Sequence, residues 1–518
     1  MNIVKTVFLI FFLIINIMPV YAIEDGKIKK GETLSLADCV AVAINNSPMI
    51  KKYEYNLEIA SSNVGIAQSA YFPTIGANAG FLQEYNTNKD YDDGASHRYL
   101  PSVGAYLNQL IWNFGKTSAL IRMEKFYKLA AEYQFMDSIC NTIYHVKTQY
   151  FNVLRAKAIL EIERNNVLIN ERNLARAKKL YESGKKPKVD YVNALVFLSE
   201  AKMRLTDAKN SYDLAMADLG NAMYIAYAPD FQIEKVETFN YDDVYTPTYL
   251  IDKSKYLEEE DDANLINVNY ETRIEKTELS KIKDLPFTLE ESYDLAYKNS
   301  PDLWVLESTL NAMKESVNYI KRQYYPDLVG SLGYEFNNRN TQTNNNFNMG
   351  VNMVSAVNIK QQKHEVDRAN AQVNLASNDI YEFKQNLYFE VKKCFLNVDK
   401  AATQVRASQV KVHEALENYE LADKNYSEGK CDYIALQEAR KEYNEAKTLH
   451  ATMIYEYNIA LAELEIAMHY HLDDLHSQAQ HALHYHYKDL INKLEESLHC
   501  EHRTEEEKNH SKNSQEQL

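Results

Sequence analysis

The second half of this chain repeats the layout of its first half. The segment Leu34–Phe81 aligns without a gap with Phe287–Tyr334, at an offset of 253 residues. Further along, Gly184 aligns with Gly429 at the smaller offset of 245 residues, so the first copy contains eight extra residues. An internal repeat of this length predicts two equivalent structural units within one architecture.

A secretory signal peptide is predicted at the N-terminus. Lys5 precedes the apolar run Val7–Val20, and Val20 and Ala22 supply the small residues of a cleavage site. The expected cut follows Ala22, so the chain is expected to leave the cytoplasm. No later stretch approaches the ~20 apolar residues of a membrane-spanning helix. Any membrane crossing is therefore expected to use strands.

Charge and cysteine content argue against several classes of protein. The chain has 73 acidic and 57 basic residues, a net charge of −16, and this balance does not support nucleic-acid binding. Its five cysteines are an odd set without a CxxC pair, so no disulfide framework is predicted. We find no Ser-His-Asp order, phosphate-binding glycine loop or catalytic carboxylate pair, so neither an enzyme nor a cofactor is expected.

Two very long helices dominate the predicted structure. Glycine and proline are absent from Thr117 to Leu180 and again from Gln362 to Asn425. Helices of this length, rising ~1.5 Å per residue, are close to 100 Å long, which is too long for the core of a globular domain. Each run ends near a glycine, Gly184 or Gly429, and an Ala/Leu-rich segment then completes the repeat. The pattern predicts two antiparallel helical hairpins.

Each repeat is also expected to contribute two strands. After Pro73 and Pro326, apolar and polar residues alternate with the period of two that is typical of a strand. The four expected strands lie at about 74–85, 99–113, 327–337 and 347–358. The Asn-rich segment Asn337–Asn346 is expected to be a hairpin loop, and Asn86–Arg98 a longer loop with the eight extra residues. Four strands cannot close a barrel, and lipid does not tolerate their unpaired edges, so a membrane-spanning chain must oligomerise.

The remaining segments are acidic or histidine-rich. The predicted organisation is a signal peptide (1–22), a first repeat (34–225), an acidic linker or insertion (226–286), a second repeat (287–468) and a polar, partly disordered tail (469–518). Nine of the 14 histidines lie after Met468, and imidazoles bind zinc, copper or nickel. The best local cluster is His499, Cys500 and His502, but it lacks an evident fourth ligand, so no metal site is predicted.

Several motifs connect these features. They are the helix junctions Asn46-Ser47-Pro48 and Asn299-Ser300-Pro301, the strand entries Tyr71-Phe72-Pro73 and Tyr325-Pro326, the strand-to-helix exit Gln109–Lys116, and the Tyr-x-x-Gly turns at 181–184 and 426–429. Each motif is weak alone, but their order, spacing and duplication resemble the TolC-type outer-membrane efflux proteins. The resemblance covers essentially Leu34–Met468.

The resemblance implies a mainly α fold with a membrane β-barrel. In such proteins a homotrimer closes twelve strands, four per chain, into one outer-membrane barrel, and long α-helical hairpins continue it as a periplasmic tunnel. They are passive ducts of Gram-negative bacteria, embedded in outer-membrane lipid. Their partners are a periplasmic adaptor (membrane fusion) protein and an inner-membrane transporter, in tripartite efflux or type I secretion systems.

The resemblance also implies a gate at the periplasmic end of the tunnel. Carried over by position, Asp190 is the acidic partner of the gate network and Tyr426 is its tyrosine. Cys431 stands where the family pattern has an arginine, which puts the salt bridge in doubt. Lys430 is adjacent and is a possible substitute, although it is a point charge without the bidentate fork of arginine. The alternative is that these are solvated residues at helix ends.

Two further features near the turns have a functional and a plain interpretation. Glu438 keeps one of two acidic constriction positions, the other being Ala435, and three copies of it in a trimer make a carboxylate ring that favours cations. The turns themselves are expected to contact the adaptor through Gly184, Lys185, Lys186 and Gly429. Lysines at a helix C-terminus also favour the helix dipole and keep an exposed loop soluble.

Two other classes of protein compete with a channel. One is an exported coiled-coil surface tether or adhesin, which does not need a strand pair in each repeat. The other is a periplasmic metal-handling protein that acts through its histidine-rich tail. Within the channel class, the sequence does not distinguish drug, metal and polypeptide substrates, because substrate choice belongs largely to the transporter and adaptor.

Overall fold

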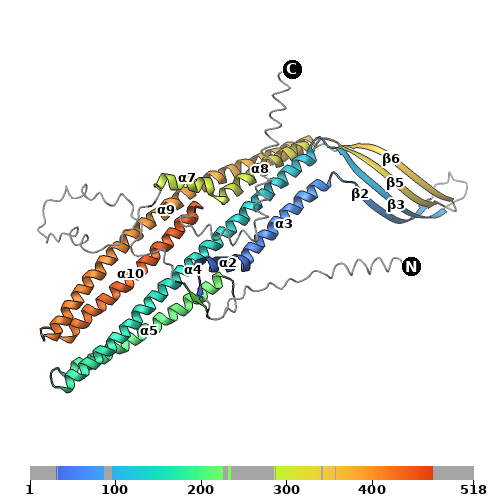
Figure 1. Cartoon of the computed structure of the whole chain (residues 1–518). Coiled ribbons are helices and arrows are strands. Elements are labelled where there is room, and N and C mark those ends of the chain that lie inside the picture. The colour runs from blue at the N-terminus through green and yellow to red at the C-terminus, as the bar shows by residue number, and fades with distance from the viewer. Residues whose placement is uncertain are drawn as a thin grey trace.

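The chain forms an elongated molecule, with the turns of long helical hairpins at one end and a sheet at the other (Figure 1). The computed structural model describes residue 31 and residues 33–86, 96–225, 231–234, 285, 287–339, 342–355 and 358–470. The expected signal peptide, most of the expected linker and nearly all of the expected tail lie outside the described residues. The same holds for the cluster of His499, Cys500 and His502.

Two hairpins of helices form the long part of the molecule. The first pairs α4 (Lys116–Glu182, 67 residues) with α5 (Lys188–Ala222), and the second pairs α9 (Ile359–Ser427, 69 residues) with α10 (Tyr433–Met468). At ~1.5 Å per residue, α4 and α9 are each about 100 Å long. α10 also packs against α4, which joins the two repeats. None of the helices in the described ranges is both long and apolar enough to cross a membrane.

Each repeat begins with two shorter helices, and the corresponding helices of the two repeats have the same length. These are α2 (Leu36–Asn46) and α3 (Pro48–Ser69) in the first repeat, and α7 (Leu289–Asn299) and α8 (Pro301–Arg322) in the second. Ser35 caps α2 and Thr288 caps α7, each in a reciprocal capping box with the acidic residue three positions later. α3 and α8 both begin with proline, whose missing N–H is not needed in the first turn of a helix.

The strands form one four-stranded antiparallel sheet. Its members are β2 (Thr74–Asn86), β3 (Ser96–Trp112), β5 (Asp327–Arg339) and β6 (Gln342–Val354), in the order β2-β3-β5-β6. The β-hairpins of the two repeats thus lie side by side, and β3 of the first pairs with β5 of the second. Among the described residues, β2 and β6 each have one edge without a neighbouring strand.

The two faces of the sheet differ in chemistry. Register partners on one face form apolar rows, such as Ala77, Ala105, Tyr334 and Phe347, or Ile75, Leu107, Leu332 and Met349. Most partners on the other face are small or polar, as in the row of Asn78, Gly104, Glu335 and Asn346, although Leu110 pairs there with Val329. Large apolar side chains remain exposed, among them Phe347 at 66% and Met349 at 82%.

The expected loop Asn337–Asn346 is wrong in its extent. β5 continues to Arg339 and β6 starts at Gln342, and these two residues are register partners. Backbone N–H and C=O groups make the ladder, so a run of asparagines can pair in the hairpin despite its polar side chains. The last strand also ends at Val354 rather than near residue 358, and the pairing of Asn86 with Ser96 shortens the other expected loop.

The expected irregular linker begins with an ordered segment. β4 (Gln232–Ile233) pairs in parallel with β1 (Thr33–Leu34), and Ile233 is buried in a core shared by α2, α4 and α5. The hydroxyl of Tyr150 donates a hydrogen bond of 2.6 Å to the carbonyl oxygen of Glu234. Acidic composition predicts solvent exposure on average, but the apolar residues here are held by a core that only the folded chain brings together.

Candidate functional site at the hairpin tips

The two helical hairpins turn through the same backbone motif. Gly184 and Gly429 both adopt left-handed conformations, with φ of +69° and +79°. In the first turn, Gly184 N–H donates to the Tyr181 carbonyl and Lys185 N–H to the Leu180 carbonyl. Equivalent bonds close the second turn. This Schellman arrangement satisfies carbonyls at the helix end and explains why glycine follows each long helix.

The turns bring two predicted site residues together. Tyr426 is in the last turn of α9, and Asp190 is in the first turn of α5, where a negative charge suits the helix dipole. The Oη of Tyr426 donates a hydrogen bond of 3.4 Å to Oδ2 of Asp190. Both side chains are buried, at 2% and 9% exposure. The bond therefore links the second repeat to the first.

Apolar contacts shield this bond from water. Tyr426 packs edge-on against Tyr433 of α10, with ring centroids 5.6 Å apart. The buried cluster around them comprises Ala177, Ala194, Tyr426, Tyr433 and Leu436, drawn from all four long helices. Burial, together with the nearby Asp190 carboxylate, raises the pKa of the Tyr426 phenol to about 12. Tyr426 thus remains a neutral donor at physiological pH.

Positive charge at the tyrosine comes from the first hairpin. The Nζ of Lys186 lies 4.5 Å from the centroid of the Tyr426 ring, and the Cζ of Arg176 lies 5.6 Å from it. Arg176 also pairs with Asp423 of α9 at 3.1 Å. A cation at this distance from an aromatic face is attracted to it. These contacts were not predicted, because no sequence spacing relates Arg176 or Lys186 to residue 426.

The other predicted gate residues do not join this network. Lys430 pairs with its near neighbour Glu428, and both side chains are exposed. Cys431, at the family's arginine position, does pack against the buried cluster of Tyr426, and it donates its thiol to the carbonyl oxygen of Ala422 at 3.5 Å. Glu438 lies on the exposed face of α10. Lys430 therefore does not replace the missing arginine at Tyr426 in this structure.

The expected adaptor-contact residues lie at the ends of the hairpins. Gly184, Lys185 and Gly429 are exposed, and a Cβ added at either glycine meets nothing within 4 Å. Lys186 is half-buried because it turns towards Tyr426. In the described part of the chain, no group of three or more His, Cys, Asp or Glu side chains is placed to hold a metal ion.

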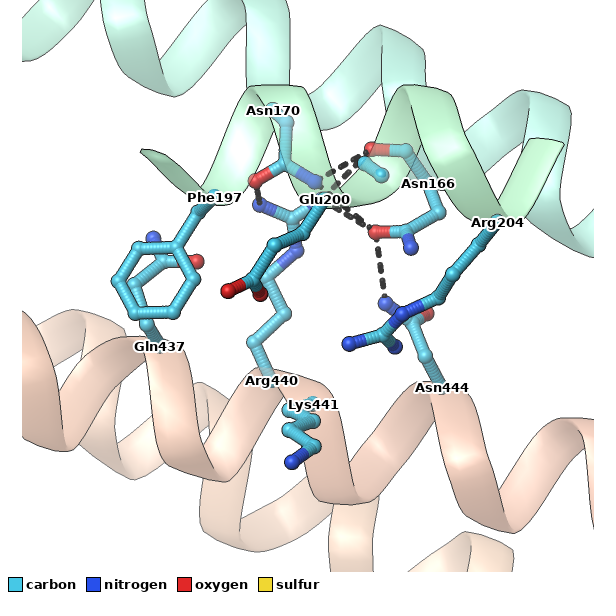
Figure 2. Close-up of a pocket in the computed structure, with 10 residues that line it drawn as sticks. Asn166, Asn170, Phe197, Glu200, Arg204, Gln437, Arg440, Lys441 and Asn444 are labelled. Carbon is cyan, nitrogen blue, oxygen red and sulfur yellow. Dashed lines mark hydrogen bonds between the residues drawn. The ribbon is translucent and has the colours of Figure 1, made fainter. Parts of the chain in front are cut away.

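A second polar cluster was not anticipated from the sequence. Farther from the hairpin turns, Arg440 and Asn444 of α10 contact Asn166 and Asn170 of α4, and all four are buried (Figure 2). Burial lowers the pKa of Arg440, but a guanidinium remains charged in proteins. The packing of α10 on α4 buries these polar residues.

Comparison with known proteins identifies the family. The family model of the outer membrane efflux proteins matches residues 40–223 and 292–468, which is more than half of the chain. The chain belongs to this family. The match falls on both repeats, which confirms the resemblance expressed in their motifs.

Individual members of the outer membrane efflux protein family are distant from this one. Outer membrane efflux protein BepC of Brucella suis biovar 1 (strain 1330) is 23% identical over 205 residues, 40% of this chain and 43% of BepC. Outer membrane protein TolC of Vibrio cholerae serotype O1 is 21% identical over 167 residues, 32% of this chain and 38% of TolC. The matches thus span less than half the length of these two relatives.

Solved structures of this type share the fold. The CmeC outer membrane channel of Campylobacter jejuni superposes with a TM-score of 0.65 at 15% identity, covering 86% of this chain and 89% of CmeC. As an outer membrane efflux protein, the chain is located in the outer membrane of a Gram-negative bacterium and extends into the periplasm. This confirms the expected location.

Proposed function

We propose that this chain is the outer-membrane channel-tunnel of a tripartite efflux or type I secretion system. It conducts substrates passively from a periplasmic adaptor and an inner-membrane transporter to the exterior. The observation that carries the proposal is the sheet at one end of the molecule, which has a mainly apolar face and, among the described residues, two open edges. The chain acts without catalysis and without a cofactor.

The sheet is suited to lipid only as part of a larger assembly. Its apolar face exposes side chains such as Phe347 and Met349, which water disfavours and a bilayer accepts. Its open edges on β2 and β6 must be paired before lipid can surround them. Three copies, each joining β6 to β2 of the next, close twelve strands into one barrel. The small and polar face then lines a water-filled lumen.

The long hairpins continue this lumen as a tunnel through the periplasm. At their far ends, the bond between Tyr426 and Asp190 holds α9 against α5 and keeps the gate closed. Lys186 supports the tyrosine in place of the family's arginine, whereas Lys430 faces solvent beside Glu428. Glu438 has its role in the trimer, as one of three carboxylates that favour cations near the gate.

The turns are the proposed contact with the adaptor. Gly184, Lys185 and Gly429 are at the exposed ends of the hairpins, and Lys186 lies just behind them. The exposed lysines Lys178, Lys179, Lys185 and Lys188 add positive charge to the first turn. This charge suits an acidic surface on the partner and would speed its association.

Single-channel conductance in planar bilayers tests the proposal. The purified full-length chain is expected to give discrete openings of uniform size. Glu438→Ala is expected to reduce the preference for cations, whereas the matched variant Glu442→Ala, on the exposed surface of the same helix, leaves it unchanged. A folded, membrane-inserted sample without conductance would instead indicate a surface tether.

A further inference from the structure

Arg440 is a buried cation whose hydrogen bonds, within the described part of the chain, go only to amide groups. Its guanidinium is on α10, and the residue is 3% exposed. Nη1 donates to Oδ1 of Asn170 at 3.0 Å, and Nη2 donates to the backbone oxygen and Oδ1 of Asn166 at 3.0 and 3.2 Å. Among the described residues, no carboxylate is within ion-pair distance of Arg440. Burying a charge without a counterion is costly.

The acceptors around this guanidinium are already in use. Oδ1 of Asn166 accepts hydrogen bonds from Arg440, from Asn170 at 3.1 Å and from Asn444 at 2.9 Å. An amide oxygen has two lone pairs, so three donors saturate it. The amide nitrogen of Asn166 donates in turn to the carboxylate of Glu163 at 3.0 Å. This carboxylate is therefore bonded to the asparagine and not to Arg440.

A cleft with room for a small ligand opens beside the network (Figure 2). Its volume is about 30 Å³, which is enough for one or two water-sized groups. The charged residues that line it are Arg204 and Glu200 of α5 and Arg440 and Lys441 of α10. Three cations thus line the cleft against one carboxylate, and one of them, Lys441, also pairs with Glu445 at 3.9 Å.

A residue with an unpartnered donor lines the same cleft. Gln437 is 4% exposed, and its Nε2 has no hydrogen-bond partner among the described residues. Leaving a buried amide donor unsatisfied is unfavourable. Water satisfies such a donor but brings two hydrogens of its own, which need acceptors. A ligand that only accepts hydrogen bonds and carries negative charge satisfies both Gln437 and Arg440.

We propose that this cleft binds a small monovalent inorganic anion of the chloride class between the two hairpins. The anion accepts from Arg440 and Gln437 of α10, and Arg204 of α5 supplies further positive charge at the cleft. Glu200 disfavours larger negative charge, and the small volume excludes bulky anions. Because the lining residues come from α4, α5 and α10, a bound anion joins the first repeat to the second. This inference does not depend on the proposed channel function.

Thermal unfolding at constant ionic strength tests for the site. The purified full-length chain is followed by circular dichroism while sodium chloride replaces sodium gluconate, whose anion is too large for the cleft. We expect a rise in Tm that saturates with chloride, and the same with bromide. Arg172→Gln, which removes an exposed guanidinium from α4, should keep this response, whereas Arg440→Gln should lose it. Equal Tm values of the unmodified chain in chloride and gluconate would overturn the proposal.

Two substitutions at Gln437 keep the test decisive if Arg440→Gln does not fold. Gln437→Leu retains the cation but removes the donor. The chloride concentration that gives half of the maximal rise in Tm should therefore increase by about tenfold, as for a lost hydrogen bond to an ion. Gln437→Glu places a tethered carboxylate in the cleft, so it should raise the Tm without chloride and abolish the chloride response. A Gln437→Glu chain that responds like the unmodified one contradicts the site.

A crystal soaked in bromide locates the ion. Anomalous density is expected beside Arg440 and Gln437, and it should be missing from crystals of Gln437→Glu. Bromide peaks confined to other places would show that any stabilisation by halide arises elsewhere, and would overturn the assignment to this cleft.

Discussion

Tyr426 and Asp190 are separated by 236 positions in the chain, and a hydrogen bond of 3.4 Å joins them at the hairpin tips. The bond connects α9 of the second repeat with α5 of the first. Because both side chains are buried, water does not readily replace either partner. Any movement that separates the two hairpin tips must break this bond, which makes it a suitable latch for a gate.

Tyr426→Phe should weaken the closed state. The substitution keeps the ring but leaves the buried Asp190 carboxylate without its donor, which costs about 1–3 kcal/mol. The open probability in planar bilayers should therefore rise by about fivefold or more. Tyr181→Phe is the control, since Tyr181 has the equivalent position in the first repeat and is 40% exposed. An unchanged open probability in Tyr426→Phe would argue against the latch.

Lys186 should stabilise the closed state through the face of the Tyr426 ring. A cation–π contact at a partly exposed site is worth about 0.5–1 kcal/mol, so Lys186→Gln should raise the open probability by about two- to fivefold. The effect should persist in a Tyr426→Phe background, which keeps the ring, and disappear in a Tyr426→Leu background. Equal effects of Lys186→Gln in both backgrounds would assign the lysine to another contact.

The same glycine-to-alanine change should have opposite effects at two places. Gly429→Ala forces a side chain into the left-handed conformation of the turn, which costs about 1–2 kcal/mol. Gly65→Ala is in the interior of α3, where alanine is the better helix former by about 0.5–1 kcal/mol. A Cβ meets nothing within 4 Å at either position, so backbone conformation alone decides the sign. Thermal unfolding should give a lower Tm for the first variant and a higher Tm for the second.

Asp137 should make stability depend on pH between about 4 and 6. Burial, with a contribution from the Asp302 carboxylate, raises its pKa from the ordinary value of 3.8 to about 6. Since the folded state holds this proton more tightly than the unfolded state, stability is fully present below pH 3.8 and is lost as pH rises through 6. Asp137→Asn should therefore raise the Tm at pH 7.5 much more than at pH 4.

A matched variant checks this assignment. Asp207→Asn removes a carboxylate from the exposed face of α5, so it should leave the difference in Tm between the two pH values unchanged. If Asp137→Asn shows the same pH dependence as the unmodified chain, another group is responsible. The neighbouring Asp302, whose pKa is also raised by burial, would be the first to examine.

Features that depend on local chemistry could be predicted from the sequence. Pro48 and Pro301 start equivalent helices because the first turn does not need their N–H groups. Gly184 and Gly429 end α4 and α9 because their conformations suit the left-handed turn. The repeat then relates one half of the chain to the other, and it was enough to indicate the family.

Features that depend on contacts between distant segments could not be predicted in this way. Ile233 is packed although its surroundings are acidic, and Lys186 rather than Lys430 reaches Tyr426. Arg440 meets Asn166 across 274 positions of sequence.

The sequence by itself determined which segments form the long helices, the paired strands and the hairpin turns, though not where the strands end, because caps, prolines, glycines and periodicity act within a few residues. Only the tertiary structure decided which polar side chains are buried and what they contact. Burial and electrostatic partners are properties of the packed hairpins, in which α10 lies against α4 and the tips of α5 and α9 meet.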